Sequence, residues 1–146
     1  IQARTAILRI GVVLSRAGGF LPPLQTAARL TLRALGSGAQ WVPWVHVDDV
    51  AHAISFLISQ PDSGGVYNLT APYPVTNYEF MATLAEVMGT ARLLPAPASI
   101  LRLALGEQAG VVLDSQKVLS NRMIEAGYKF KFPTLEVALD NLVRRK

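Results

Sequence analysis

His46 is the side chain of this sequence best suited to move a proton near neutral pH, because an imidazole titrates there. Its chain neighbours are both valines, and no residue that would orient its ring can be identified from the sequence. A half-buried strand histidine therefore stays open as the alternative to a general acid or base. His52 follows on what is predicted to be a helix. Two such isolated histidines do not predict a metal site, and we expect none.

Asp48 and Asp49 follow His46 directly. As an acidic pair they could carry a raised pKa, but a carboxylate at this point can also accept the free amide protons of a first helical turn. We therefore predict that one of them is the N-cap of a helix beginning near residue 50. The apolar side chains expected on one face of that helix are Val50, Ile54, Leu57 and Ile58.

Two glycine pairs, Gly18-Gly19 and Gly36-x-Gly38, could approach a phosphate closely. Neither pair opens a helix directly after a strand in the G-x-G-x-x-G manner, so neither is by itself a dinucleotide fingerprint. A lone tryptophan is more often part of a core, but Trp41 and Trp44 flank a proline in a predicted loop, so they are also candidates for contact with a ligand. The pair Gln116-Lys117 could bind an anion, although a solvated helix face is the simpler interpretation.

The predicted elements place these residues between strands and helices. Residues 5–14 are β-branched and almost wholly apolar, which predicts a strand buried on both faces, as in a parallel sheet. A glycine loop over 15–20 leads to a helix over 21–35. A short strand around 44–47 precedes the helix that follows the aspartates. After a turn at 61–65, residues 66–70 form a strand, and a Thr76–Glu79 capping box opens a helix that Gly89 ends.

The remaining residues predict a mostly helical end. Residues 92–97 form an extended connector, residues 98–105 and 113–126 form helices, and the alternating residues 129–132 form a short strand. Thr134 caps a last helix. Its inward side chains are expected to be Leu135, Ala138, Leu139 and Leu142. The order of strands and helices predicts an α/β fold with a small C-terminal lobe.

Composition limits the class of protein. The chain has 146 residues, 51% of them hydrophobic and only 16% charged, and it begins at Ile1. We interpret it as a piece of a longer protein, because such an excess of apolar side chains suits a half removed from its partner. The absence of cysteine excludes a disulfide scaffold and thiol catalysis. The scattered arginines do not predict nucleic-acid binding, and no apolar run is long enough to span a membrane.

Several catalytic patterns are missing from the sequence. The chain has four tyrosines, and none is followed by lysine four residues later. The Tyr-x-x-x-Lys pair of hydride-transferring dehydrogenases is therefore absent, and no nucleophile elbow is present. We predict no catalytic residue within these residues.

Four segments resemble the C-terminal half of extended short-chain dehydrogenases/reductases. Residues 9–15 (R-I-G-V-V-L-S) loosely resemble the family's R-x-x-N-V-Y-G strand, and residues 36–51 closely resemble its G-D-G-x-Q-x-R-D-[FY]-x-H-V-x-D-x-A motif. Tyr67-Asn68 and residues 76–79 resemble its Y-N strand and S/T-x-x-E helix start. The tail, at 95–107, 115–119 and 125–135, is similar to that of epimerase family proteins of uncertain substrate.

The sequence departs from the family pattern at informative places. Val42 and Pro43 stand where nucleotide-sugar epimerases have arginine and aspartate, and valine cannot pair with a substrate pyrophosphate. A nucleotide-sugar substrate is therefore not expected. Val12 and Leu14 replace asparagine and tyrosine, which makes that loop more apolar than usual.

The resemblance implies the fold and the parts of the site. Residues 1–91 would be the last strands and helices of a Rossmann-type parallel sheet, and residues 92–146 a helical substrate lobe. NAD or NADP would lie near Ile10, Gly11, Val12 and Val13, at the carboxyl end of a strand. The substrate pocket would be lined by Gly18, Gly19, Gln40, Trp41, Trp44 and His46.

The resemblance also implies partners for the chain. A missing N-terminal half would hold the glycine loop and the Tyr/Lys pair, so these residues alone would be inactive while the longer parent would be an oxidoreductase or epimerase acting on a small molecule. A non-catalytic binding or structural protein that keeps the fold is the alternative. We expect the cytoplasm or an organelle matrix as the compartment, and a homodimer is possible.

Overall fold

The computed structural model describes residues 4–29, 32–35, 37–90, 94–96 and 115–144, and only the backbone of 32–35 and 94–96. The first predicted strand is two strands, β1 (Ala6–Ile10) and β2 (Val12–Ser15). β1 pairs in parallel with β7 (Gly65–Leu69), and β2 pairs in parallel with β6 (Trp44–His46). The break falls at Gly11, where the extended chain exchanges one neighbouring strand for another.

β1 is not buried on both faces, which corrects the sequence prediction. Ile7 is 53% exposed and Ile10 is 44% exposed. Among the described strands β1 pairs with β7 alone, so its other edge has no strand beside it there. The apolar sequence that predicts a buried strand is present, but the described residues do not cover it.

Helix α2 (Val47–Ser59) follows β6 without a loop, and its N-cap is His46 rather than Asp48 or Asp49. The imidazole accepts a hydrogen bond from the Asp48 amide and thereby replaces the predicted carboxylate. The buried face also differs from the predicted one, since Ile54 and Ile58 are exposed. The residues that α2 buries are Asp49, Ala53 and Leu57.

Helix α1 (Leu21–Arg29) is shorter than the predicted helix over 21–35, because residues 32–35 form strand β4 (Leu32–Leu35). β4 pairs in parallel with β9 (Leu94–Ala96), which lies in the predicted connector. Before α1, the glycine loop contains β3 (Gly18–Gly19), antiparallel to β2. Gly36, the predicted end of the helix, lies outside the described residues.

Helix α3 (Asn77–Met88) confirms the predicted capping box, with Thr76 as N-cap and the Glu79 carboxylate accepting a hydrogen bond from the Thr76 backbone N–H. Gly89 adopts the left-handed conformation with φ 65° and ends the helix as predicted. The preceding strand β8 (Val75–Thr76) pairs antiparallel with β5 (Trp41–Val42).

The C-terminal part is less helical than predicted. Residues 115–120 are extended, and helix α6 covers only Asn121–Glu125 of the predicted 113–126. Residues 129–132 form no strand, because they are bound to a side chain of α2 instead of a backbone neighbour. Helix α7 (Leu135–Val143) buries the four predicted side chains. The predicted helix over 98–105 lies outside the described residues.

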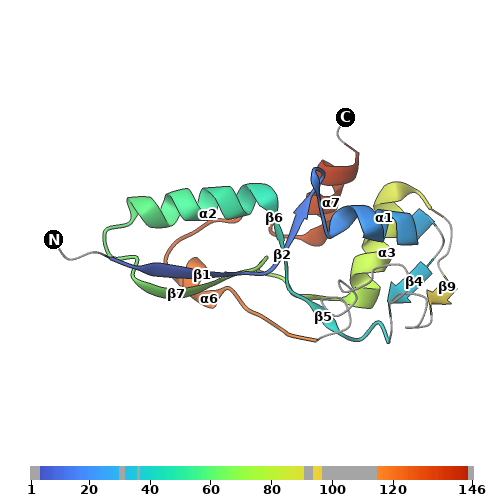
Figure 1. Cartoon of the computed structure of the whole chain (residues 1–146), viewed down its shortest axis with the longest axis horizontal. Coiled ribbons are helices and arrows are strands. Elements are labelled where there is room, and N and C mark those ends of the chain that lie inside the picture. Colours follow the sequence, from blue (N-terminus) through green and yellow to red (C-terminus); the bar gives the residue numbers. More distant parts are fainter. Residues whose placement is uncertain (1–3, 30–31, 36, 91–93, 97–114, 145–146) are drawn as a thin grey trace.

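The elements separate into two ends (Figure 1). At one end α1, α3 and α7 gather around a hydrophobic cluster that includes Leu14, Trp44, Phe80, Met81 and Leu139. At the other, β1 and β7 lie side by side along α2, with a smaller cluster that includes Val45, Leu57 and Leu69. No helix in the described part of the chain is long and apolar enough to cross a membrane.

Candidate functional site

A cavity of about 490 Å³ lies where β1 passes into β2. It contains all four residues predicted to face the cofactor, which run from the carboxyl end of β1 through Gly11 into the first residues of β2. Gly19, Phe20 and Pro43 complete the wall, so the cavity is largely apolar. Its lining residues are Ile10, Gly11, Val12, Val13, Gly19, Phe20 and Pro43.

Gly11 holds this cavity in shape through its backbone. Its N–H donates to the Leu69 carbonyl at 3.1 Å, and the next N–H, of Val12, donates to the Pro43 carbonyl at 2.7 Å. A Cβ on Gly11 would lie 2.2 Å from that Pro43 oxygen and 2.9 Å from a methyl carbon of Thr70. The close approach of three segments therefore requires glycine here, independently of any ligand.

The two predicted substrate glycines form a tight hairpin with β2. Gly18 and Gly19 have φ values of 147° and 75°, which other residues rarely adopt. Gly19 pairs with Leu14 and lines the cavity, whereas Gly18 pairs with Ser15 and is not part of its wall.

A second cavity, of about 300 Å³, adjoins the first and shares Ile10, Gly11 and Pro43 with it. Its roof is the extended segment 115–120, which we call the strap. Gln116 and Val118 of the strap face Arg9 of β1 and Asn68 and Thr70 at the end of β7. Gln116 and Lys117 thus lie on an extended segment, not on the predicted helix face.

Gln40 ends the loop that precedes β5, and Trp41 is the first residue of β5, paired with Thr76 just before α3. The Gln40 carbonyl accepts a hydrogen bond from the Asn77 amide at 2.8 Å, and its side-chain oxygen accepts one from Ser37. Gln40 is buried, so its amide supports the loop. Trp41 is half-buried, and the Lys117 ammonium lies 4.4 Å from the centre of its ring, a cation–π contact.

Trp44 belongs to the hydrophobic cluster around α3 and is 1% exposed. Its indole N–H has no hydrogen-bond partner among the described residues, which is costly for a buried donor. The structure therefore separates the two tryptophans, with Trp41 beside the strap and Trp44 in the core.

His46 is also buried, and both of its ring nitrogens are engaged. Nδ1 accepts from the Asp48 amide at 3.0 Å, and Nε2 lies 3.3 Å from the Asn141 side-chain oxygen. The ring stacks on Phe132 with centroids 3.7 Å apart. Burial lowers the pKa of His46, outweighing Asp48, the Asn141 hydrogen bond and Asp49, which raise it. These contacts favour a neutral imidazole that joins α2 to α7.

Asp49 was assigned only a capping role by the sequence, and the structure gives it a different one. Its buried carboxylate accepts the Tyr128 hydroxyl at 2.9 Å and the amides of Lys131 and Phe132 at 2.8 and 2.9 Å. Burial, with the bond to Asp49, raises the pKa of the Tyr128 phenol far above its usual value. Asp49 thus fixes the chain that leads into α7, and no local sequence signal indicates this.

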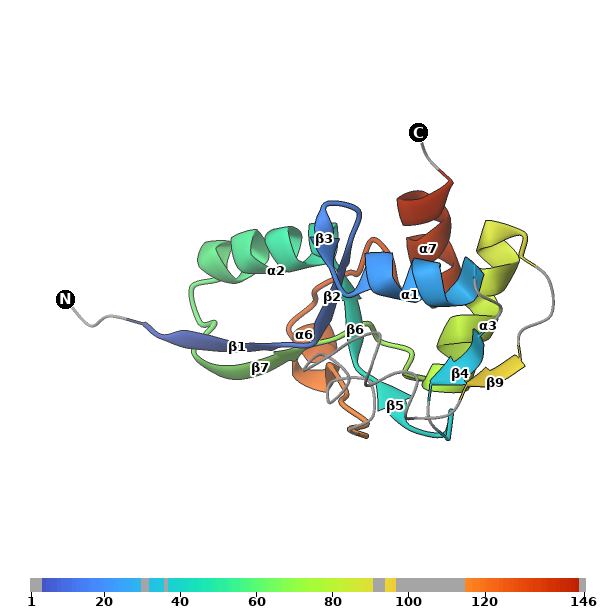
Figure 2. The same ribbon diagram turned by 45° about the vertical axis from the view of Figure 1, so that its right-hand side comes forward.

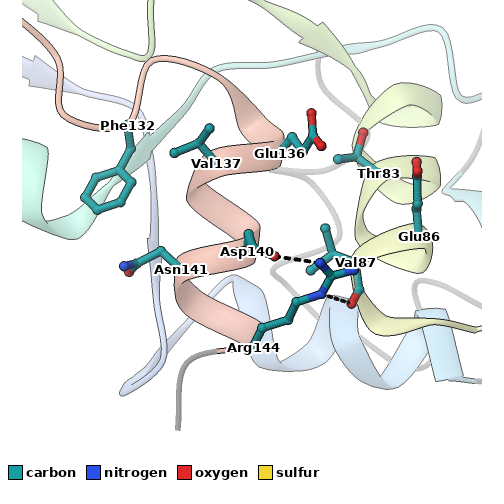
Figure 3. A pocket seen from close by; sticks show the side chains of 9 residues that line it. All are labelled: Thr83, Glu86, Val87, Phe132, Glu136, Val137, Asp140, Asn141 and Arg144. Atoms are coloured by element: carbon teal, nitrogen blue, oxygen red, sulfur yellow. Dashed lines mark hydrogen bonds and ion pairs between the residues drawn. The ribbon is translucent and has the colours of Figure 1, made fainter.

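A third cavity, of about 650 Å³, lies between α3 and α7 (Figure 3). Its wall carries the carboxylates of Glu86, Glu136 and Asp140, and Arg144 pairs with Asp140 at 2.9 Å. Phe132 and Asn141 line it too, so it lies on the far side of the residues that hold His46. It contains none of the predicted site residues. The described residues include no group of acidic or histidine side chains arranged to hold a metal.

Comparison with known proteins relates two parts of this chain to known families. Residues 12–70 match the NAD dependent epimerase/dehydratase family, and residues 96–142 match a domain of unknown function, DUF1731. The chain therefore carries a region of the NAD dependent epimerase/dehydratase type, followed by a region of the DUF1731 type. An epimerase family protein of Staphylococcus aureus is 40% identical over 143 residues, 97% of this chain and 48% of that protein. A Staphylococcus epidermidis relative is 41% identical, with the same coverage.

Solved structures agree with this assignment. Human epimerase family protein SDR39U1, crystallised with NADPH, is 33% identical and has a TM-score of 0.88, covering 98% of this chain and 49% of that one. A dTDP-glucose 4,6-dehydratase from Bacillus anthracis in complex with NAD, 19% identical with a TM-score of 0.70, shares the fold. It covers 95% of this chain and 43% of that one. The predicted Rossmann-type α/β class is confirmed, and the chain spans about half the length of the curated relatives it matches.

Proposed function

We propose that this chain is the substrate side of an NAD(P)-dependent oxidoreductase or epimerase. The observation that carries the proposal is the cavity at the β1–β2 junction, which is lined by Ile10 at the carboxyl end of β1, by Gly11, and by Val12 and Val13 at the start of β2. The nicotinamide ring would rest against this apolar wall, while Gly11 and Val12 hold the backbone in place. The cofactor would supply hydride acceptance and donation.

The chain's own residues would bind and orient but not transfer the proton. None of the tyrosines has a lysine four residues later, and the imidazole of His46 is engaged at both nitrogens. The glycine loop and the Tyr/Lys pair would come from a preceding half of the fold, adding to β1. Residues 1–91 would then complete the Rossmann sheet, and residues 92–146 would form the substrate lobe. Such a protein would work in the cytoplasm or an organelle matrix, where nicotinamide cofactors are available.

The substrate would be a small molecule other than a nucleotide sugar. Val42, which stands where relatives of that specificity have arginine, is buried, and the neighbouring Pro43 carbonyl is occupied by Val12. Valine at this position cannot itself pair with a pyrophosphate as arginine would.

The test compares the chain alone with the longer polypeptide in which it is encoded. The chain alone should not oxidise NADPH or NADH with any of a panel of aldehydes and ketones, and the longer polypeptide should. In the longer polypeptide, Val12→Phe should weaken cofactor binding by roughly tenfold by filling the cavity. The control is Val137→Phe on the exposed side of α7. Absence of cofactor binding to the longer polypeptide would favour the non-catalytic alternative.

A further inference from the structure

The second cavity, under the strap, has polar residues in its wall that contact with a nicotinamide ring would not require. Arg9 and Asn68 are directly opposite each other in the parallel pairing of β1 with β7, so their side chains lie on the same face of the sheet. Gln116 reaches the same space from the strap. Among the described residues that line the cavity, Arg9 is the charged one and none carries a carboxylate.

The guanidinium of Arg9 has no hydrogen bond or ion pair with any residue that the structure describes. Arg4, Arg16, Arg122 and Arg144 are engaged, and Arg122, for example, donates to the carbonyls of Val66 and Gly64 at 2.9 and 2.7 Å. Arg29, at the end of α1, resembles Arg9 in having no such bond with a described residue, but it does not line the cavity. A guanidinium offers five donors in a planar fork that matches a carboxylate or a phosphate. Arg9 is thus available for an anion at the edge of a cavity.

The strap holds this space open by bonds on both sides of it. Ser115 accepts the Trp41 amide at 3.1 Å, and Lys117 lies over the Trp41 ring. Further along, the Val118 and Leu119 carbonyls each accept a side-chain hydrogen bond at 3.3 Å, from Thr70 and Asn68 respectively. Gln116 lies between these attachments and faces Arg9. The strap runs beside β7 into α6 (Figure 2).

We infer that the strap cavity is a subsite for an anionic group of the substrate, a carboxylate or a phosphate, bound by Arg9 with Gln116. This inference rests on the proposed function and adds the substrate class, a small acidic carbonyl or hydroxy compound. The shared wall of Ile10, Gly11 and Pro43 places the anion next to the nicotinamide cavity, so the rest of the substrate would extend toward the hydride. A volume of about 300 Å³ suits a small molecule.

The experiment titrates the 146-residue chain with inorganic phosphate and, separately, with malonate, following by NMR the backbone amide signals of Asn68 and Gln116, which line the cavity and are present in every variant. We expect a saturable shift with at least one of the two anions, and the tighter of them identifies the group. Arg9→Gln should weaken that binding about tenfold or more, since hydrogen bonds to a charged group are the strong ones. Arg9→Lys should retain part of it.

Arg29→Gln is the matched control. Arg29 is exposed at the end of α1, so this substitution removes the same charge at a site away from the strap. Equal weakening in both variants would show general charge attraction and overturn the subsite. So would the absence of a saturable shift. Displacement of phosphate from Arg9 by NADPH or NADH in the longer polypeptide would assign the site to the cofactor and overturn its assignment to the substrate. If Arg9→Gln leaves anion binding unchanged while Val12→Phe still weakens cofactor binding, this inference alone is rejected and the proposed function stands.

Discussion

The two ends of the molecule differ in how much of their large apolar side chains is exposed. At the closed end, formed by α1, α3 and α7, Phe80, Met81 and Leu139 are completely buried. At the open end, formed by β1, β7 and α2, Ile58 is 71% exposed and Ile7 and Ile54 are also exposed. Both ends carry large apolar side chains, and the two ends differ in how far the described residues cover them.

The open end has the features of a sheet that continues. β1 carries an edge without a strand among the described residues, and a shallow cavity between β1 and α2 is lined by Ala6, Leu8 and Ile54. An exposed apolar edge strand is normally avoided because it associates with other chains. The candidate site lies between the two ends, where β1 gives way to β2. The closed end can therefore fold around its own core, while the open end marks where the proposed other half would add.

The largest expected effect tests this contrast directly. Phe80→Ala at the closed end should lower the free energy of unfolding by about 3–5 kcal/mol, because it leaves a cavity in a packed core. Ile58→Ala at the open end should change it by less than about 0.5 kcal/mol. Urea unfolding of both variants measures the difference. Similar losses in the two variants would mean that the open end is as well packed as the closed one.

Local features of the fold could be predicted from the sequence. The Thr76–Glu79 capping box, the Gly89 helix end and the buried stripe of α7 depend on residues within a turn or two of one another, and all three are confirmed. The predicted helix over 21–35 failed because β4 gains a strand partner, β9, about sixty residues away in sequence. Tertiary pairing overrode local preference at that point.

The candidate site could be predicted only where the family resemblance covered it. The resemblance indicated Ile10 to Val13, which line one cavity, but it gave Trp44 and His46 a place in the substrate pocket, and both are buried in contacts with the protein. Contact of a ligand with the six residues of the predicted substrate pocket, Gly18, Gly19, Gln40, Trp41, Trp44 and His46, stays a prediction. Arg9 was missed because its role depends on Gln116, which is more than a hundred residues away. Strand alternation alone would have placed it on the face opposite Ile10.

The link between the two ends gives the second prediction. Asp49→Asn puts an amide where the carboxylate accepts two backbone N–H groups and the Tyr128 hydroxyl, and should cost about 2–3 kcal/mol of unfolding free energy. Asp48→Asn removes only an exposed 3.5 Å ion pair with Lys131 and should cost less than about 1 kcal/mol. Urea unfolding curves of the two variants measure these two losses of unfolding free energy. Equal costs would show that the contacts of Asp49 do not hold α7 to α2.

The third prediction concerns the junction between the two ends, at Gly11. Gly11→Ala should cost about 1–3 kcal/mol, because its methyl group meets the Pro43 carbonyl and the backbone has to shift. Gly64→Ala is the control, since its methyl would have only ordinary contacts, at 3.9 Å or more, and should be nearly neutral. Thermal unfolding compares the two. A neutral Gly11→Ala would mean that β1 and β2 can change partners without this close approach.

The smallest expected effect is a dependence of stability on pH that comes from the contact between α2 and α7. Burial holds the pKa of His46 below its ordinary 6.5, so below pH 6.5 the unfolded chain binds a proton that the folded chain does not. Stability should therefore be complete above pH 6.5 and fall as the pH decreases from there, by at most about 1.4 kcal/mol per pH unit. Asp48 and Asp49 oppose this shift and Lys131 adds to it, but burial outweighs them.

Unfolding free energies at pH 7.5, 6.5 and 5.5 measure this dependence for the chain and for His46→Asn. Asparagine can still cap α2 through its side-chain oxygen but does not titrate, so the variant should lose the His46 part of the pH dependence while its baseline stability drops with the lost stacking on Phe132. An identical pH dependence in the two proteins would mean that His46 is protonated as easily in the folded chain as in the unfolded one. The contact between His46 and α7 would then be open to water, and the packed core of the closed end would not extend from α7 to the start of α2.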